Sequence, residues 1–182
     1  ESWKRMTHHP WPISVLQHGY KLQFTKTPIP WKSRPMKIST TEQISINEAV
    51  SKSLEAEIIK KSQTQDKSFL SNFFTIQEAT KRRPILNCQQ LNQFLQCEHF
   101  KMEGVPALRE ILEKDDYMCK IDLKDAYVVV PIHSHSRKYL TFQNERIVYQ
   151  YRSLAFGLNI APRIFSKIMK YAIEPLRKEG IR

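Results

Sequence analysis

Two carboxylates stand three positions apart in a run that is otherwise almost wholly apolar and β-forming. They are Asp122 and Asp125, within the stretch KIDLKDAYVVVPI at residues 120–132. Val, Ile and Tyr suit a pleated, half-buried surface, so the stretch predicts a strand from Ile121 to Ile132. Burying an ionised carboxylate is unfavourable unless the charge is paired. The stretch therefore implies a cation, a set of backbone donors, or a turn that returns the chain to water.

Asp122 is the stronger candidate for chemistry. It ends a second predicted strand, YMCKIDL at residues 117–123, where side chains emerge from a rigid sheet. A Mg²⁺ ion bound through one or two carboxylates and substrate phosphates would satisfy such a residue. The structural alternative is a surface aspartate that caps a backbone amide where a strand turns. On this short stretch alone the capping interpretation is favoured.

The overall charge bears on the choice of partner. Lys and Arg total 29 against 18 Asp and Glu among 182 residues, which gives a formal charge of +11. Such a surplus favours a polyanion, because neutralising phosphates releases their counterions. A basic protein with no such partner is an equally weighted interpretation of charge alone.

Other residue types that bind metals or form crosslinks give no recognisable site. The three cysteines, Cys88, Cys97 and Cys119, are odd in number and lack zinc spacing, so we expect reduced, partly buried thiols. The adjacent His8 and His9 are expected in a solvated loop. No apolar run approaches the roughly 18 residues of a membrane span, and the first residues are not a signal peptide. We expect an intracellular protein, in the cytoplasm or nucleus and not secreted, and a chain starting with Glu is expected to be an excised segment.

The elements that must position these residues follow from the pattern of apolar residues. Residues 1–45 hold all three tryptophans and many prolines and predict an extended arm. A helix is expected over 46–61, with Ser45 and Glu48 at capping-box spacing. A hairpin with a polar tip should follow, NFFTIQ then RPILN, and next a helix opened by Gly104 and Pro106 through ALREILEK.

The last third of the chain predicts a second hairpin and a long helix. The strands KYLTFQ and RIVYQY flank Asn144 and Glu145. The helix APRIFSKIMKYAIEPLRKEG has Pro162 near its start and Gly180 as a stop, and Pro175 should kink it or end it early. One face of this helix should be apolar, with Ile164, Phe165, Ile168, Met169 and Ala172. Helices mixed with hairpins in this order predict an α+β fold.

Three blocks together resemble the fingers and palm of reverse transcriptases. They are KRRPILNCQQLNQF, CKIDLKDAYVVVPI and YRSLAFGLNIAPRIF, in that order, and the intervening EHFKMEGVPALREIL looks like retrotransposons of the DIRS type, which carry a tyrosine recombinase. The resemblance runs from about Ile46 to Arg182. It implies a right-hand polymerase fold with an arm over 1–45, fingers over 46–116, and a partial palm over 117–182 with an interleaved fingers hairpin.

The resemblance also assigns roles to individual residues. It implies that Asp122 and the backbone carbonyl of Leu123 bind metal, that Asp125 and Ala126 offer backbone amides to the incoming triphosphate, and that Tyr127 blocks a ribose 2′-hydroxyl. The resemblance also implies that Arg83 contacts the triphosphate and that Phe156 and Gly157 lie beside the nascent base pair. It places Pro162 and Arg163 at the start of the palm helix, on the side of the template and primer. A plain core aromatic at Tyr127 and a solvated charge at Arg163 remain the structural alternatives.

What the resemblance implies for function is an RNA-directed DNA polymerase. It would use two Mg²⁺ ions, with Mn²⁺ as a substitute, deoxynucleoside triphosphates, and a primer on an RNA or DNA template. An RNase H or recombinase would belong to the same element polyprotein, and no membrane is involved. The family's tyrosine-x-aspartate-aspartate tetrad does not occur in residues 1–182, so this segment alone is expected to be inactive. The fingertip also departs from the family, which usually has lysines where Gln77 and Glu78 stand.

Two other classes of function stay open. One is a non-catalytic, decayed or domesticated module that binds nucleic acid. The other is a glycoside hydrolase with Asp122 and Asp125 as paired acids, although two residues three apart across a turn need not face one substrate.

Overall fold

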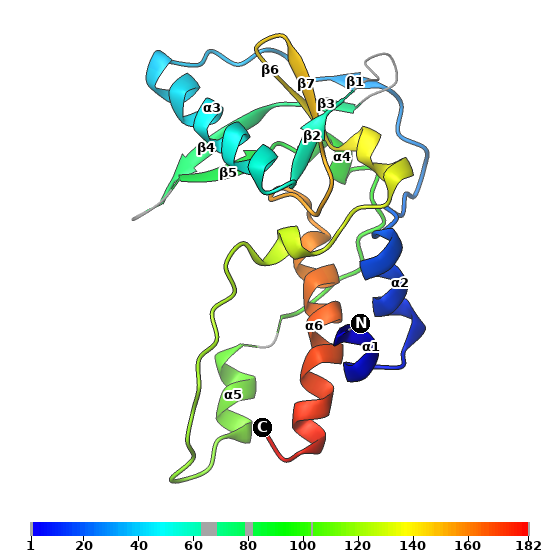
Figure 1. The fold of residues 1–182 in the computed structure, drawn as a ribbon, viewed down its shortest axis with the longest axis vertical. Coiled ribbons are helices and arrows are strands. Elements are labelled where there is room, and N and C mark those ends of the chain that lie inside the picture. Colours follow the sequence, from blue (N-terminus) through cyan, green and yellow to red (C-terminus); the bar gives the residue numbers. More distant parts are fainter. Residues whose placement is uncertain (1, 63–68, 79–81, 103, 182) are drawn as a thin grey trace.

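The computed structural model describes residues 2–62, 69–78, 82–102 and 104–181. Two small sheets and one long helix form one part of the molecule, and the C-terminal helix leads away from them with shorter helices on either side (Figure 1). The helices are α1 Ser2–Met6, α2 Pro10–His18, α3 Thr40–Glu55, α4 Gln89–Asn92, α5 Val105–Ile111 and α6 Ala161–Lys178, with 3₁₀ helices η1 Ala126–Val129 and η2 Ser134–Tyr139. The strands are β1 Trp31–Lys32, β2 Ile59–Lys61, β3 Phe69–Ser71, β4 Phe73–Gln77, β5 Arg82–Leu86, β6 Thr141–Asn144 and β7 Ile147–Tyr151.

The larger sheet has five strands in the order β1-β3-β6-β7-β2. β1, β3 and β6 run parallel, whereas β6, β7 and β2 run antiparallel. The second sheet is the hairpin β4-β5, and Phe73 of that hairpin stacks on the fully buried Phe142 at 4.2 Å between ring centroids. The predicted α+β class is confirmed, and the larger sheet is mixed rather than purely antiparallel.

Both predicted hairpins form. In the first, β4 and β5 pair from Phe73 with Leu86 to Gln77 with Arg82, and most of its predicted polar tip, 79–81, lies outside the described residues. In the second, β6 and β7 meet at a two-residue turn of Glu145 and Arg146, one residue later than predicted. Glu145 takes a left-handed conformation there, with φ 54°, which suits a tight hairpin turn.

Helix α3 begins and ends about six residues earlier than the sequence predicts. Its N-cap is Ser39 and not Ser45: the Glu42 amide donates to the Ser39 hydroxyl, and the Ser39 amide donates to the Glu42 carboxylate at 2.9 Å. The Ser39 hydroxyl also donates to the Glu42 carboxylate, at 2.8 Å. The hydrogen bond from the Ser39 amide and, after it, the one from the Ser39 hydroxyl lower the pKa of Glu42. The chain offers two capping-box spacings six residues apart, and the earlier one is used.

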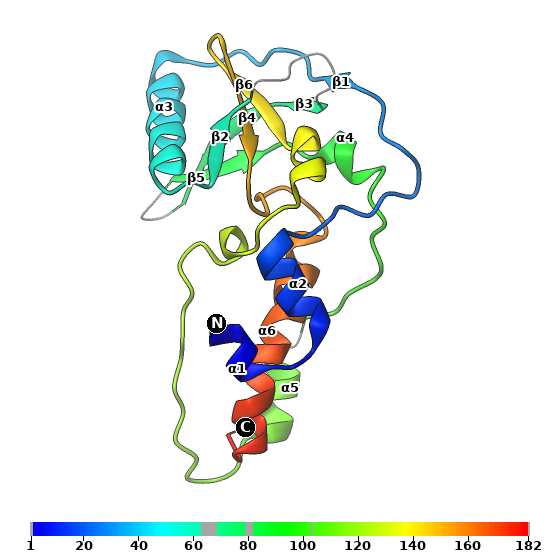
Figure 2. The same cartoon turned by 45° about the vertical axis from the view of Figure 1, so that its right-hand side comes forward.

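The prediction of an extended arm is wrong for residues 2–18, which form α1 and α2. Proline is tolerated in the first turn of a helix, and α2 places Pro10 there, so prolines that suggest a loop instead begin a helix. His9 is its N-cap, and the Trp11 amide donates to His9 Nδ1 at 3.2 Å. His8 and His9 are exposed in the loop between α1 and α2, as expected, and the His9 ring also lies 4.8 Å from that of Tyr171 on α6. Figure 2 shows α1 and α2 against α6.

The predicted strands over 117–132 are largely absent. Residues 114–125 form no strand, and Tyr117, Met118 and Ile121 are exposed. A strand needs a neighbour for its backbone hydrogen bonds, and among the described residues none lies alongside this segment. Burial begins only at Val130 and Ile132, where the Ile132 amide donates to the Arg152 carbonyl at 2.7 Å.

Helix α6 follows the prediction except at Pro175. Ile164 and Ile168 are buried, while the other predicted apolar positions, Phe165, Met169 and Ala172, are half-buried. The helix passes through Pro175 without ending and stops at Lys178. Gly180 follows with φ 87°, and the Ile181 amide donates to the Leu176 carbonyl at 3.0 Å, which satisfies the last turn.

The three cysteines are free thiols. Cys97 and Cys119 are exposed, whereas Cys88 is buried. Burial raises the pKa of the Cys88 thiol to about 12, so it stays protonated and unreactive at neutral pH. None of the helices in the described part of the chain is long and apolar enough to cross a bilayer.

Candidate functional site

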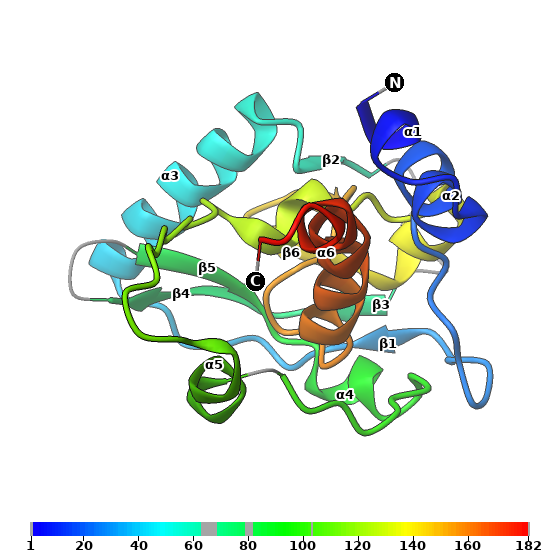
Figure 3. The same cartoon turned by 90° about the horizontal axis from the view of Figure 1, so that it is seen from below.

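One pocket of about 550 Å³ gathers most of the residues singled out from the sequence. Its walls come from β5, the turn over 122–127, the loop before α6 and the start of α6 itself. Figure 3 shows the ribbons of β5 and α6 from below. The predicted residues in it are Arg83, Asp122, Leu123, Asp125, Ala126, Tyr127, Phe156 and Pro162. Segments 80 residues apart in sequence are therefore neighbours at one site.

The two carboxylates of the opening stretch lie on a turn, in water. Both Asp122 and Asp125 are exposed, so neither carries the burial penalty that a strand would impose. Asp125 has φ 51° and ψ 46°, a left-handed conformation that aspartate tolerates, and the Val128 amide donates to its carbonyl at 3.0 Å. The turn to solvent removes the burial penalty for both side chains, and it also leaves Asp122 open to a cation.

Arg83 reaches the pocket from β5. Its Nη2 lies 2.9 Å from the Glu78 carboxylate, and its guanidinium lies 4.9 Å from the centre of the Phe156 ring. An ion pair on one side and an aromatic face on the other hold the guanidinium at the pocket wall.

Tyr127 belongs to an aromatic cluster at the base of the pocket. Its ring lies 5.0 Å from that of Phe156 and 5.9 Å, edge-on, from that of Phe165. The side chain is half-buried, so it combines the predicted pocket position with the core packing that was the structural alternative.

Gly157 is required by the backbone that lies beside it. With φ 118°, a Cβ at this position would stand 1.9 Å from the Leu86 carbonyl oxygen of β5. The Leu86 amide donates to the Phe156 carbonyl at 3.0 Å, so the loop is hydrogen-bonded to that strand. Gly157 itself does not line the pocket, and its predicted contact with a nucleotide stays a prediction.

Asn92 is a residue that the sequence reasoning missed. Its Nδ2 donates to the Gly157 carbonyl at 2.9 Å, and its Oδ1 accepts from the Asn159 amide at 3.2 Å. These two bonds fix the loop that carries Phe156. A half-buried Asn in the short helix α4 gives little signal in a single sequence, because its partners are 65 and 67 residues away.

Arg163 lies outside this pocket. It is paired with Glu98 and lines a groove of about 470 Å³ along α6, which adjoins the pocket and shares Met102, Phe165 and Ser166 with it. The structural alternative for Arg163 was a solvated surface charge, and the structure has an ion pair instead.

The pocket also includes four residues not assigned there from sequence: Met102, Lys124, Phe165 and Ser166. Lys124 could have been predicted as a pocket residue, because it lies between Asp122 and Asp125 in the sequence and belongs to the same exposed turn.

The oxygen ligands at the pocket suit a hard divalent ion only with help from a substrate. Asp122 and the Leu123 carbonyl are the protein ligands that the family resemblance implies, and both residues line the pocket. In the part of the chain that the structure describes, no three His, Cys, Asp or Glu side chains are grouped to hold a metal. Mg²⁺ commonly binds through one or two carboxylates and substrate phosphates, so the residues present fit one such ion bound together with a phosphate ligand.

Comparison with known proteins decides the family. The family described as "Reverse transcriptase (RNA-dependent DNA polymerase)" matches residues 59–181. This chain belongs to the reverse transcriptase family. The matched range contains the whole pocket, from Arg83 to Ser166.

Viral polyproteins are among the relatives of this reverse transcriptase domain. The genome polyprotein of Petunia vein clearing virus (isolate Shepherd) is 31% identical over 115 residues, which are 63% of this chain and 5% of that protein. The enzymatic polyprotein of Cauliflower mosaic virus (strain Strasbourg) is 24% identical over 149 residues, 81% of this chain and 22% of that protein. The chain thus spans a small part of either relative. These similarities do not support the predicted relationship to DIRS-type elements. They also leave the predicted retrotransposon origin without support.

Proposed function

We propose that the chain is the nucleotide-handling part, fingers and partial palm, of an RNA-directed DNA polymerase. The supporting observation is the convergence on one pocket of Arg83, from β5, with Asp122 and Tyr127, from the turn over 122–127. A cation for phosphates, a carboxylate for a metal ion and a ring against the sugar are the groups that nucleotide selection needs.

Within this proposal each residue acts on a different part of the incoming deoxynucleoside triphosphate. Arg83 donates to the triphosphate oxygens, and the amides of Asp125 and Ala126 donate to them from the turn. Tyr127 stands at the sugar and excludes a 2′-hydroxyl, while Phe156 supports the base pair and Pro162 begins the helix on the template side. Asp122 and the Leu123 carbonyl would hold Mg²⁺, and the chemistry that this ion would supply is activation of a hydroxyl and neutralisation of phosphate charge.

The experiment is primer extension by a longer polypeptide of the same protein that includes the family's tyrosine-x-aspartate-aspartate hairpin. With an RNA template, a DNA primer, Mg²⁺ and four deoxynucleotides, we expect template-dependent extension that Asp122→Asn abolishes. Residues 1–182 alone should show only background extension, because the tetrad is absent from them. A folded longer protein without extension would contradict the proposal.

A second candidate is a non-catalytic module that binds nucleic acid, and the charge of +11 favours it. The same experiment separates the two, because a binding module holds the primer-template without extending it. The remaining proposals concern the parent protein: a polyprotein of a mobile element or a virus, with an RNase H or a recombinase among its other domains.

A further inference from the structure

Glu78 forms an ion pair with Arg83, the cation that the proposed function assigns to the triphosphate. Both carboxylate oxygens face the same guanidinium nitrogen: Oε1 lies 2.9 Å and Oε2 3.2 Å from Arg83 Nη2. Two short contacts to one nitrogen mean that this donor is already taken. The two side chains are 34% and 37% exposed, so the pair is within reach of solvent, and Arg83 lines the pocket.

The hairpin register places Glu78 beside Arg83. Arg83 pairs with Ile76 across the hairpin, and Glu78 follows Ile76 by two residues, so both side chains lie on one face as diagonal neighbours. The contact therefore follows from the pairing of β4 with β5, and no distant element has to move to form it.

Arg83 has a second support that does not depend on Glu78. The guanidinium rests over Phe156, 4.9 Å from the ring centre, and Phe156 is fixed by the hydrogen bond from the Leu86 amide. When the carboxylate leaves, the arginine can stay in place. Glu78, by contrast, has solvent on its open side.

We propose that Glu78 is an internal anion that competes with the triphosphate for Arg83 and so lowers nucleotide affinity. This rests on the proposed function of the pocket. The opposite role, in which Glu78 orients Arg83 and thereby assists binding, predicts the opposite sign for the effect of removing the carboxylate. Asp122 and Asp125 are also acidic and line the pocket, but neither is paired with Arg83 in the structure.

The test is the affinity of residues 1–182 for deoxythymidine triphosphate with Mg²⁺, measured by calorimetry at low salt. Glu78→Gln keeps the size of the side chain and removes its charge, and we expect binding roughly 2- to 5-fold tighter, the range for one exposed ion pair. The matched control is Glu57→Gln, which breaks the Glu57–Arg152 pair (3.0 Å) away from the pocket and changes the net charge by the same amount. It should leave the affinity unchanged.

Arg83→Gln separates failure of this inference from failure of the proposed function. We expect it to weaken binding of the triphosphate but not of thymidine, and to abolish the gain from Glu78→Gln in the double variant. If Arg83→Gln weakens binding while Glu78→Gln does not tighten it, or Glu57→Gln tightens it equally, the competitor role is overturned and the pocket assignment stands. If Arg83→Gln has no effect on triphosphate binding, the assignment of the pocket is overturned as well.

Discussion

Tyr127 is the side chain in the pocket whose size can be changed most informatively. Replacing it by alanine removes the bulk that would meet a 2′-hydroxyl, so the preference for a deoxynucleoside over a ribonucleoside triphosphate should fall by about 10- to 200-fold, or about 1 to 3 kcal/mol. Calorimetric titration of the two nucleotides, compared as a ratio, measures this. Tyr127→Phe should leave the ratio nearly unchanged, and an unaltered ratio in a folded Tyr127→Ala protein would remove Tyr127 from the site.

The comparison must be a ratio because the ring also packs. Tyr127 contacts both Phe156 and Phe165, so its truncation weakens the aromatic cluster and lowers the affinity for both nucleotides together. A general loss cancels in the ratio, whereas a lost steric clash does not.

Asn92 should act by holding the loop that carries Phe156. Asn92→Ala removes one donor and one acceptor, and we expect unfolding in urea to show a loss of about 1 to 2 kcal/mol. Asn92→Asp keeps the acceptor for the Asn159 amide but sets a carboxylate oxygen against the Gly157 carbonyl, so it should be no more stable than the alanine variant. Equal stability of all three proteins would mean that these hydrogen bonds contribute nothing.

Residues that could be assigned from sequence are those whose chemistry is rare in their local context. Asp122 is conspicuous because a carboxylate interrupts an apolar run. Arg83 is conspicuous because it lies in KRRPILNCQQLNQF, one of the blocks that resemble reverse transcriptases. Asn92 and Glu78 act through partners fixed by the fold, Asn92 on a loop about 65 residues away and Glu78 on Arg83 in the adjoining strand. A single sequence does not display such pairings.

At the scale of elements, the approach of one loop to β5 is the feature most sensitive to change. Gly157→Ala would place a methyl 1.9 Å from the Leu86 carbonyl oxygen, at a φ of 118° that other residues rarely adopt. We expect a loss of about 3 kcal/mol or more in the free energy of unfolding.

Gly180 provides the matched control for that variant. It also has a positive φ, 87°, but a Cβ there would meet nothing within 4 Å. Gly180→Ala should therefore cost only about 1 kcal/mol, the conformational part alone. Similar losses from the two variants, measured by urea unfolding, would show that the close approach to β5 is unimportant.

Hairpins and the C-terminal helix could be predicted because their signals are local. Alternation in β6 and β7 and the apolar spacing in α6 are complete within each element. The segment around Ile121 has the composition of a strand but no neighbouring strand among the described residues, and composition does not reveal whether a partner is present. The start of α3 could not be predicted for a similar reason. Ser39 with Glu42 and Ser45 with Glu48 have the same capping-box spacing, and the spacing alone does not show which pair begins the helix.

At the scale of the molecule, the charge of +11 predicts binding to nucleic acid without sequence preference. Phosphate contacts should dominate, so the logarithm of the binding constant should fall linearly with the logarithm of salt concentration, with a slope of about −0.9 for each phosphate neutralised on duplex DNA. Titration of a labelled primer-template at several salt concentrations measures the slope. A flat dependence, or a strong preference among unrelated sequences, would count against this interpretation.

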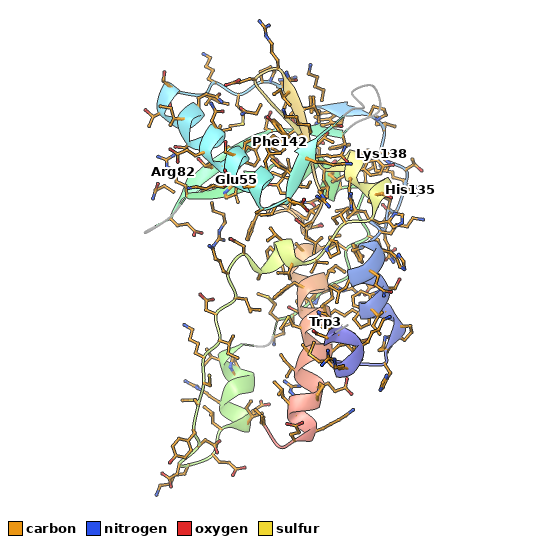
Figure 4. All side chains as sticks on the ribbon, in the orientation of Figure 1. Trp3, Glu55, Arg82, His135, Lys138 and Phe142 are labelled. Carbon is orange, nitrogen blue, oxygen red and sulfur yellow. The ribbon has the colours of Figure 1, made fainter. Side chains whose placement is uncertain are left out.

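The helical form of the N-terminal segment, which docks on α6, is a property of the whole molecule that the sequence did not reveal. Lys167 lies 4.4 Å from the Trp11 ring centre, and the rings of Trp11 and His9 meet Tyr171. Helix α1 also packs on α6, with the half-buried Trp3 between them (Figure 4). Prolines and tryptophans without a helical period suggested an arm, because the apolar surface that orders them lies some 150 residues away.

The measurement that tests the nucleotide site most directly is an NMR titration. Backbone amide chemical shifts of isotope-labelled residues 1–182 are followed as deoxythymidine triphosphate and Mg²⁺ are added. We predict that the largest changes fall on residues 122–127 and on Phe156 and Gly157, with a matching change at the Arg83 side chain. Changes concentrated instead in the groove along α6, at Lys167, Lys170 and Ile173, or absent from the turn over 122–127, would contradict the assignment of this pocket.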